Sequence, residues 1–185
     1  MHLTRDSLGL LFVALALSAC GEQPAPPAEP ASAPPASTCG GRGYLQAELS
    51  GALSASVDWT DAALRCESML RPDDRGVRLR FSGDVGGERL AIIIAIPDLE
   101  AGMAGTDIDA VVTVTVEGSG RFFSTPNLGA CWADIDVNEP QPQQPGARIV
   151  AGALACVGPL GEFNGDAFVE LRNVRFSGIA SWGTP

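Results

Sequence analysis

The sequence predicts an all-β protein: an antiparallel β-sandwich of about nine strands with two disulfides, following a signal peptide and a disordered linker. Apolar and polar residues alternate at every second position, which is typical of half-buried strands. Glycine and proline recur about every ten residues, which is the turn spacing of a sandwich. Four cysteines follow residue 38, an even set suited to two disulfides. We place the sandwich domain at residues 39–185.

Residues 1–19 have the features of a secretory signal. Arg5 lies in a short polar segment, residues 8–17 are apolar, and small residues follow. A permanent membrane helix is disfavoured because a bilayer core needs about 20 apolar residues. Ordinary cleavage before Ala19 is the other alternative, but it leaves Cys20 as an odd fifth thiol.

The end of this segment, Leu17-Ser18-Ala19-Cys20, resembles the lipobox of bacterial lipoproteins. The resemblance implies cleavage before Cys20, diacylglycerol on its sulfur and a further acyl chain, such as palmitate, on its amine. Three chains would hold the protein stably at a membrane, whereas one chain binds only reversibly. The residue after the modified cysteine is Gly21 and not an aspartate. By analogy with the sorting rule of Gram-negative lipoproteins, the resemblance then implies the outer membrane. The expected localisation is therefore the bacterial cell envelope, through a lipid anchor.

The next segment, residues 20–38, is expected to be a disordered tether. It consists almost entirely of Pro, Ala, Ser, Glu and Gln, with six prolines from Pro24 to Pro35. Such a composition cannot bury a core and favours extended polyproline conformations.

The strands of the domain follow from the alternation and from the turn residues between them. The run from Leu90 to Ile96 is apolar on both faces, which predicts a central strand covered on both sides. Asn164-Gly165 predicts a two-residue hairpin turn, because both positions tolerate positive φ. Strands are expected near residues 44–49, 52–59, 64–70, 77–81, 90–96, 110–116, 121–124, 131–137, 147–157, 167–172 and 174–179.

The four cysteines of the domain allow three disulfide connectivities. We favour the pairs that are nearest in sequence, Cys39 with Cys66 and Cys131 with Cys156. The second pair would face the core across a hairpin. A zinc site is the alternative, but no Cys-x2-Cys pair is present and an exported chain meets an oxidising compartment.

Composition and charge exclude several function classes. The single histidine, His2, belongs to the signal segment, and the sequence contains no lysine. Serine or cysteine nucleophiles that need an imidazole base, and phosphate loops that need lysine, are therefore excluded. The net charge of -10 disfavours nucleic acid and favours cationic proteins or divalent cations as partners. We expect a monomer.

Two pairs of carboxylates are weak candidates for a calcium site: Asp107, Asp109, Asp134 and Asp136. Calcium takes six to eight oxygen ligands, and aspartates at strand ends could supply several. No calcium-loop pattern is present, so the simpler interpretation is a solvated strand face, and no metal or other cofactor is assigned. The same carboxylates could serve a glycoside hydrolase, whose mechanism needs neither His nor Lys. We assign no catalytic residue.

Trp132 is a weak candidate for a binding residue, because it alternates out of phase with Cys131 and could lie on an outer face. Burial in a second apolar face is the alternative. A basic cluster, Arg71, Arg75, Arg78 and Arg80, could bind phosphate or form a solvated strand edge.

We therefore expect a non-enzymatic binding or structural module with an envelope protein or glycan as its partner. The alternatives are a carboxylate-dependent hydrolase of envelope glycans, and an inhibitor or chaperone of cationic proteins.

Overall fold

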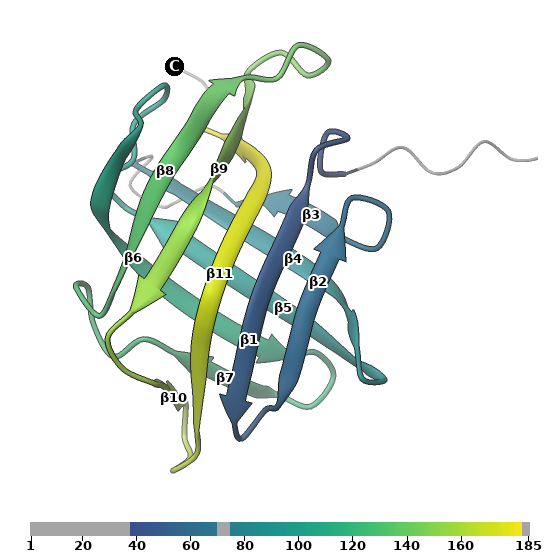
Figure 1. The fold of residues 1–185 in the computed structure, drawn as a ribbon, viewed down its shortest axis with the longest axis vertical. Coiled ribbons are helices and arrows are strands. Elements are labelled where there is room, and N and C mark those ends of the chain that lie inside the picture. Colours follow the sequence, from purple (N-terminus) through teal and green to yellow (C-terminus); the bar gives the residue numbers. More distant parts are fainter. Residues whose placement is uncertain (1–37, 70–74, 183–185) are drawn as a thin grey trace, which may run out of the picture. The chain divides into compact units, whose positions relative to one another are not determined.

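A computed structural model describes residues 38–69 and 75–182, which form eleven β-strands and no helix (Figure 1). The chain divides into two compact units, Met1–Pro34 and Pro35–Pro185. The first unit lies outside the described residues, so the signal peptide, the modification of Cys20 and nearly all of the tether remain predictions. In the part of the chain that is described, no helix has the length and hydropathy needed to cross a bilayer.

Five strands form the layer that faces the viewer in Figure 1, which we call the front layer. All neighbours in it are antiparallel. In spatial order they are β2 (Ala55–Thr60), β1 (Tyr44–Gly51), β11 (Phe168–Ser181), β9 (Ala147–Cys156) and β8 (Cys131–Pro140).

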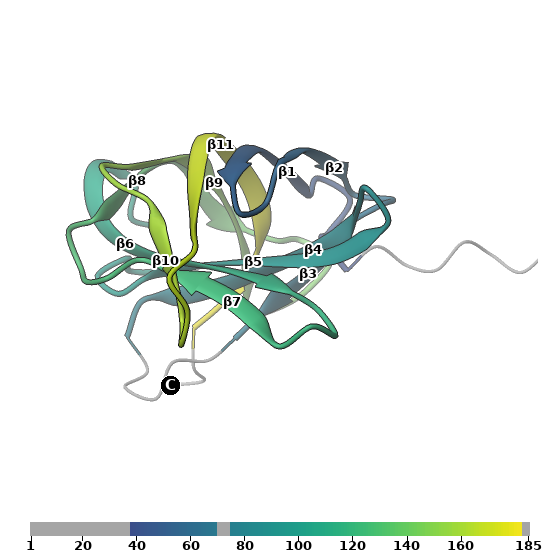
Figure 2. The same cartoon turned by 90° about the horizontal axis from the view of Figure 1, so that it is seen from below.

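The remaining strands form a back layer whose strands cross those of the front layer (Figures 1 and 2). In spatial order they are β3 (Arg65–Ser68), β4 (Val77–Val85), β5 (Glu88–Ile96), β6 (Gly105–Val116), β7 (Arg121–Ser124) and β10 (Leu160–Glu162). Two long strands join the layers into one continuous sheet. The first half of β6 pairs with β8 and its second half with β5 and β7, while β11 pairs with β1, β9 and β10.

The core lies between the two layers, as the alternation predicts. Val77, Leu79 and Phe81 of β4 are buried, and the Phe81 ring lies 6.0 Å from that of Phe176 on β11. Trp59 of β2 packs on Gly83, where a Cβ atom would lie 2.7 Å from the indole ring. The two layers therefore pack closely where the large ring of Trp59 on β2 faces Gly83 on β4.

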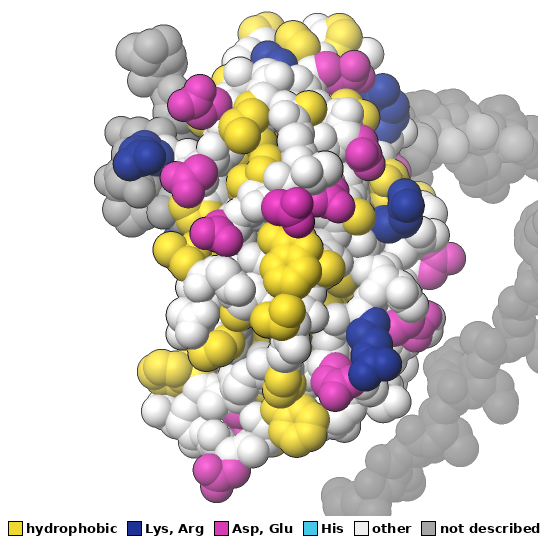
Figure 3. Space-filling model, turned by 60° about the vertical axis from the view of Figure 1, so that its left-hand side comes forward, with side chains coloured by type: hydrophobic (Ala, Val, Ile, Leu, Met, Phe, Trp, Pro, Cys, Tyr) yellow, Lys and Arg dark blue, Asp and Glu magenta, His cyan; other side chains and the backbone are white. Residues whose placement is uncertain are grey.

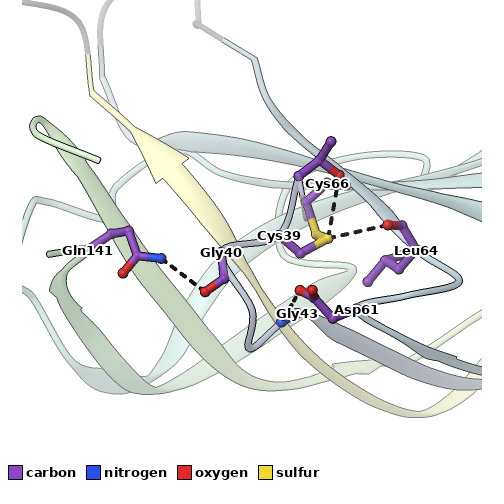
Figure 4. The surroundings of a disulfide bond; sticks show 8 residues. Cys39, Gly40, Gly43, Asp61, Leu64, Cys66 and Gln141 are labelled. Atoms are coloured by element: carbon purple, nitrogen blue, oxygen red, sulfur yellow. Dashed lines mark hydrogen bonds between the residues drawn. A yellow bond between two sulfur atoms is a disulfide. The ribbon is translucent and has the colours of Figure 1, made fainter. Parts of the chain in front are cut away.

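Both predicted disulfides are confirmed. Cys131 and Cys156 occupy directly opposite positions on β8 and β9, with their Cα atoms 4.0 Å apart. Cys39 joins the segment before β1 to Cys66 on β3 (Figure 4). Two hydrogen bonds hold the same segment: the Gln141 side chain donates to the Gly40 carbonyl at 3.1 Å, and the Gly43 amide donates to Asp61 at 3.0 Å.

The all-β, antiparallel fold is confirmed, but the number of strands is eleven rather than about nine. The expected strands at residues 167–172 and 174–179 are one strand, β11, because Asn173 forms a bulge without ending the ladder. The short strand β10 was not expected. The hairpin at Asn164 is present, but its loop is longer than two residues, because the Glu162 amide donates to the Ala167 carbonyl at 2.8 Å. Ile93 on β5 stays half-exposed, so full coverage of both strand faces is wrong there.

Candidate functional site

A groove of about 610 Å³ crosses the outer face of the front layer. It lies where β9 separates from β11: their pairing ends at Leu154 and Val174, while β11 continues beside β1. The groove is lined by residues 46–48 of β1, 56–58 of β2, 153–155 of β9 and 173–175 of β11. A site on four paired strands has a rigid backbone, which suits binding of a ligand without reorganisation.

A bulge in β11 shapes this groove. Gln46 pairs with Arg175 and Glu48 pairs with Arg172, so β11 carries an extra residue relative to β1. Asn173 lies in this bulge with φ of 53°, in the left-handed region that non-glycine residues rarely adopt. Bulges increase local twist and re-aim side chains, and they are common beside functional sites.

Polar side chains line one side of the groove and small ones the other. Gln46 donates to Asp58 and Ser56 donates to Glu48, each at 3.1 Å, which holds both carboxylates in place. The side chains of Asn173 and Arg175 make no hydrogen bond or ion pair with the described residues, so their polar groups are available to a ligand. Across from them, Ala153 and Ala155 leave the space open.

Trp132 borders the groove. It pairs with Ala155 on one side and with Asp109 on the other, and paired residues project from the same face of a sheet. Its neighbours Cys131 and Ala133 are buried, while Trp132 is only half-buried. The outer-face interpretation of Trp132 is therefore the one the structure favours. Trp59, by contrast, is a core residue whose indole nitrogen donates to the Asp84 carbonyl.

The four candidate aspartates lie on β6 and β8, on or next to the stretch where these two strands pair beside Trp132. Asp107 has φ of 57° in a bulge of β6, and its backbone amide donates to the Asp134 carboxylate at 2.9 Å. Asp109 and Asp136 are exposed. Among the described residues, no three His, Cys, Asp or Glu side chains come close enough together to hold a metal ion.

Of the described arginines in the predicted cluster, Arg75 and Arg80 are engaged in ion pairs, while Arg78, half-buried on β4, is in none. Arg75 pairs with Asp98, and Arg80 pairs with Glu67 and Glu117. Arg71 lies outside the described residues.

Elsewhere on the back layer, Arg121 donates to Glu162 at 2.6 Å. This hydrogen bond and the charge of Arg121 lower the pKa of the Glu162 carboxyl, and the same contact raises the pKa of Arg121. Glu162 is therefore held ionised, as suits a structural ion pair and not a general acid.

No family model, curated protein or solved structure matches this chain. The candidate site therefore stands on geometry alone. Of its residues, sequence patterns indicated only Trp132, which lies at the border of the groove. The lining residues are spread from Gln46 to Arg175, and only the pairing of β1 with β11 brings those two together.

Proposed function

We propose that this protein is a lipid-anchored binding module of the bacterial cell envelope with no catalytic activity of its own. The observation that carries the proposal is the open groove on the outer face of the front layer. Unbonded polar side chains at Asn173 and Arg175 and the half-buried ring of Trp132 give this face the mix of aromatic surface and polar groups that is enriched in binding sites.

The lipobox-like sequence supports the anchored half of the proposal. Lipidation at Cys20 also accounts for the one cysteine that remains after the two disulfides are formed. The acid and base groups of the predicted mature chain are carboxylates and arginines, a set that serves recognition better than proton transfer at neutral pH.

The anchor is tested by mass spectrometry of the N-terminal peptide and by fractionation of expressing cells. We expect Cys20 to carry acyl groups and the protein to sediment with membranes. The Cys20→Ala variant is expected to lose both properties. An unmodified Cys20 on a protein free in the medium would refute the anchored half.

The binding surface is tested by filling the groove. Ala153→Phe with Ala155→Phe places two rings in the open side, and Ala62→Phe, at an exposed turn, is the matched control. Purified acylated protein in detergent is incubated with solubilised envelope membranes and with purified sacculi, and the retained material is quantified. We expect the double variant to lose retention while its melting temperature and the control stay unchanged. Equal retention by all three proteins would refute the groove as the binding surface.

A further inference from the structure

Charge is distributed unequally between the two outer faces of the domain. On the back layer, Arg80 bridges Glu67 and Glu117, and Arg89 links Glu117 at 2.8 Å to Asp84 at 3.4 Å. Arg65, Arg78 and Glu88 form no ion pair among the described residues, but the numbers of charges balance. Four arginines (Arg65, Arg78, Arg80 and Arg89) accompany four carboxylates (Glu67, Asp84, Glu88 and Glu117) along or beside β3, β4 and β5. This face has little unbalanced charge to offer a partner.

The front layer and the adjoining half of β6 carry unmatched negative charge. Six carboxylates on this side form no ion pair within residues 38–69 and 75–182, whereas two arginines, Arg148 and Arg175, are without such a partner there, and Arg148 is bonded to Asn138. The six are Glu48, Asp58, Asp107, Asp109, Asp134 and Asp136. The resulting field attracts cations and repels anions.

An aromatic ring lies within this acidic surface. Figure 3 shows the side of the domain with β6 and β8, where apolar side chains form a vertical run with acidic groups on both sides of its upper part. Trp132 is paired in register with Asp109, and Asp134 is the next outward residue on its own strand. A guanidinium or ammonium group above the indole would gain a cation–π contact and nearby carboxylates at once.

The groove has the dimensions of a short extended chain. It crosses four strands, and strands lie about 4.8 Å apart, so it is on the order of 15 Å across. An extended polypeptide advances about 3.4 Å per residue, so four or five residues would span this width. Asn173 and Arg175 offer N–H groups that suit the carbonyl oxygens of such a segment.

We propose, building on the proposed binding function, that the groove and the Trp132 surface bind an extended basic polypeptide segment of a partner protein. One basic side chain stacks on Trp132 near Asp109, and another lies toward Glu48 and Asp58 at the opposite side of the groove. Charge complementarity selects this occupant over an acidic glycan, which six unmatched carboxylates would repel.

The test uses a matched pair of peptides, acetyl-Ala-Arg-Ala-Ala-Ala-Arg-Ala-amide, whose arginines lie about 14 Å apart in an extended chain, and the same peptide with citrulline in place of arginine. Citrulline keeps the shape of arginine but carries no charge. Binding to the full-length acylated protein in neutral detergent is measured by titration calorimetry. We expect the arginine peptide to bind at least tenfold more tightly than the citrulline peptide, and to weaken as salt is raised.

Three variants locate the contact. We expect Trp132→Leu, and Asp109→Asn with Asp136→Asn, each to weaken arginine-peptide binding at least fivefold. The control, Glu67→Gln with Asp98→Asn, makes the same change in net charge elsewhere and should alter binding less than twofold. Melting temperatures confirm that each variant folds.

Equal affinity for both peptides, no binding of either, or equal losses in the control variant would overturn the basic-segment proposal. Chitohexaose, a neutral glycan, serves as the competing ligand. If it binds and the groove-filling variant abolishes that binding, the binding function stands and its occupant is a glycan. If groove filling changes no retention at all, the binding function itself fails.

Discussion

Arg121 on β7 and Glu162 on β10 form an ion pair, with the arginine Nε 2.6 Å from the carboxylate. The pair closes the back layer where only two register positions link these strands. Because the folded state lowers the pKa of Glu162, its stabilising effect is fully present above the carboxyl's ordinary pKa. That effect is lost as pH falls through the lower, folded-state pKa.

We therefore expect Glu162→Gln to lower the urea midpoint at pH 7, and the difference from the unsubstituted protein to shrink below about pH 4.3. Glu170→Gln is the control, since Glu170 also lies 2.6 Å from an arginine, Arg172, but that arginine is largely exposed. It should cost less, as exposed pairs contribute little. A difference for Glu162→Gln that stays constant down to pH 2 would contradict the titration argument.

Gly152 on β9 is expected to tolerate no side chain. A Cβ atom there would lie 2.0 Å from the Asp134 carbonyl oxygen, which belongs to the backbone of the paired strand. Gly152→Ala should therefore destabilise the domain by about 1–3 kcal/mol or more, as overpacking against an unyielding backbone group does. Gly161→Ala on β10, where a Cβ meets no atom within 4 Å, should change the free energy of unfolding by less than about 1 kcal/mol. Denaturant titration that gave equal effects would contradict this packing.

Removal of the Cys39–Cys66 disulfide should lower stability substantially. The bond closes a loop with a sequence separation of 27, for which the chain-entropy relation gives about 3–4 kcal/mol. We expect the double substitution Cys39→Ser with Cys66→Ser to show this loss in urea unfolding. A non-reduced digest of the unsubstituted protein should contain the Cys39 and Cys66 peptides joined. Recovery of Cys39 joined to Cys131 would contradict the pairing.

Trp59 should matter more to stability than Trp182. Trp59 is buried, and its indole donates at 3.0 Å to the Asp84 carbonyl, while Trp182 is half-buried and donates at 3.1 Å to Leu99. Trp59→Phe removes this hydrogen bond and part of the indole surface that packs on Gly83 in the core, which should cost about 1–3 kcal/mol. The Trp182→Phe variant should lose less, because the Trp182 ring is only half-buried and gives up less packing. Equal losses of melting temperature in the two variants would contradict the prediction that the more deeply buried tryptophan contributes more to stability.

The sequence predicted the strands wherever alternation is uninterrupted, and it failed where a single residue breaks the pattern. Val77 to Phe81 alternates cleanly, and those burial positions are correct. Asn173 shifts the alternation by one residue, so β11 resembled two strands. Asp136 has the same effect on β8, where Val137 is only half-buried instead of sharing the buried face of Cys131 and Ile135.

The candidate site was less predictable than the fold. Periodicity indicated that Trp132 could face outward, because the direction of a side chain follows from its neighbours on the same strand. The groove depends on β1 lying beside β11 and on the point at which β9 leaves β11, which are long-range pairings. A local pattern contains no information about which distant strand will become a neighbour.

The fastening of residues 38–43 determines how the domain would respond to mechanical load. Tension applied from the N-terminal side reaches Cys39 before it reaches β1, and the covalent bond to Cys66 transfers that tension to β3. The load is then shared between the pairing of β3 with β4 and the pairing of β1 with β11, instead of acting on β1 alone. Under oxidising conditions the groove strands would thus stay assembled at forces that detach β1 once the disulfide is reduced.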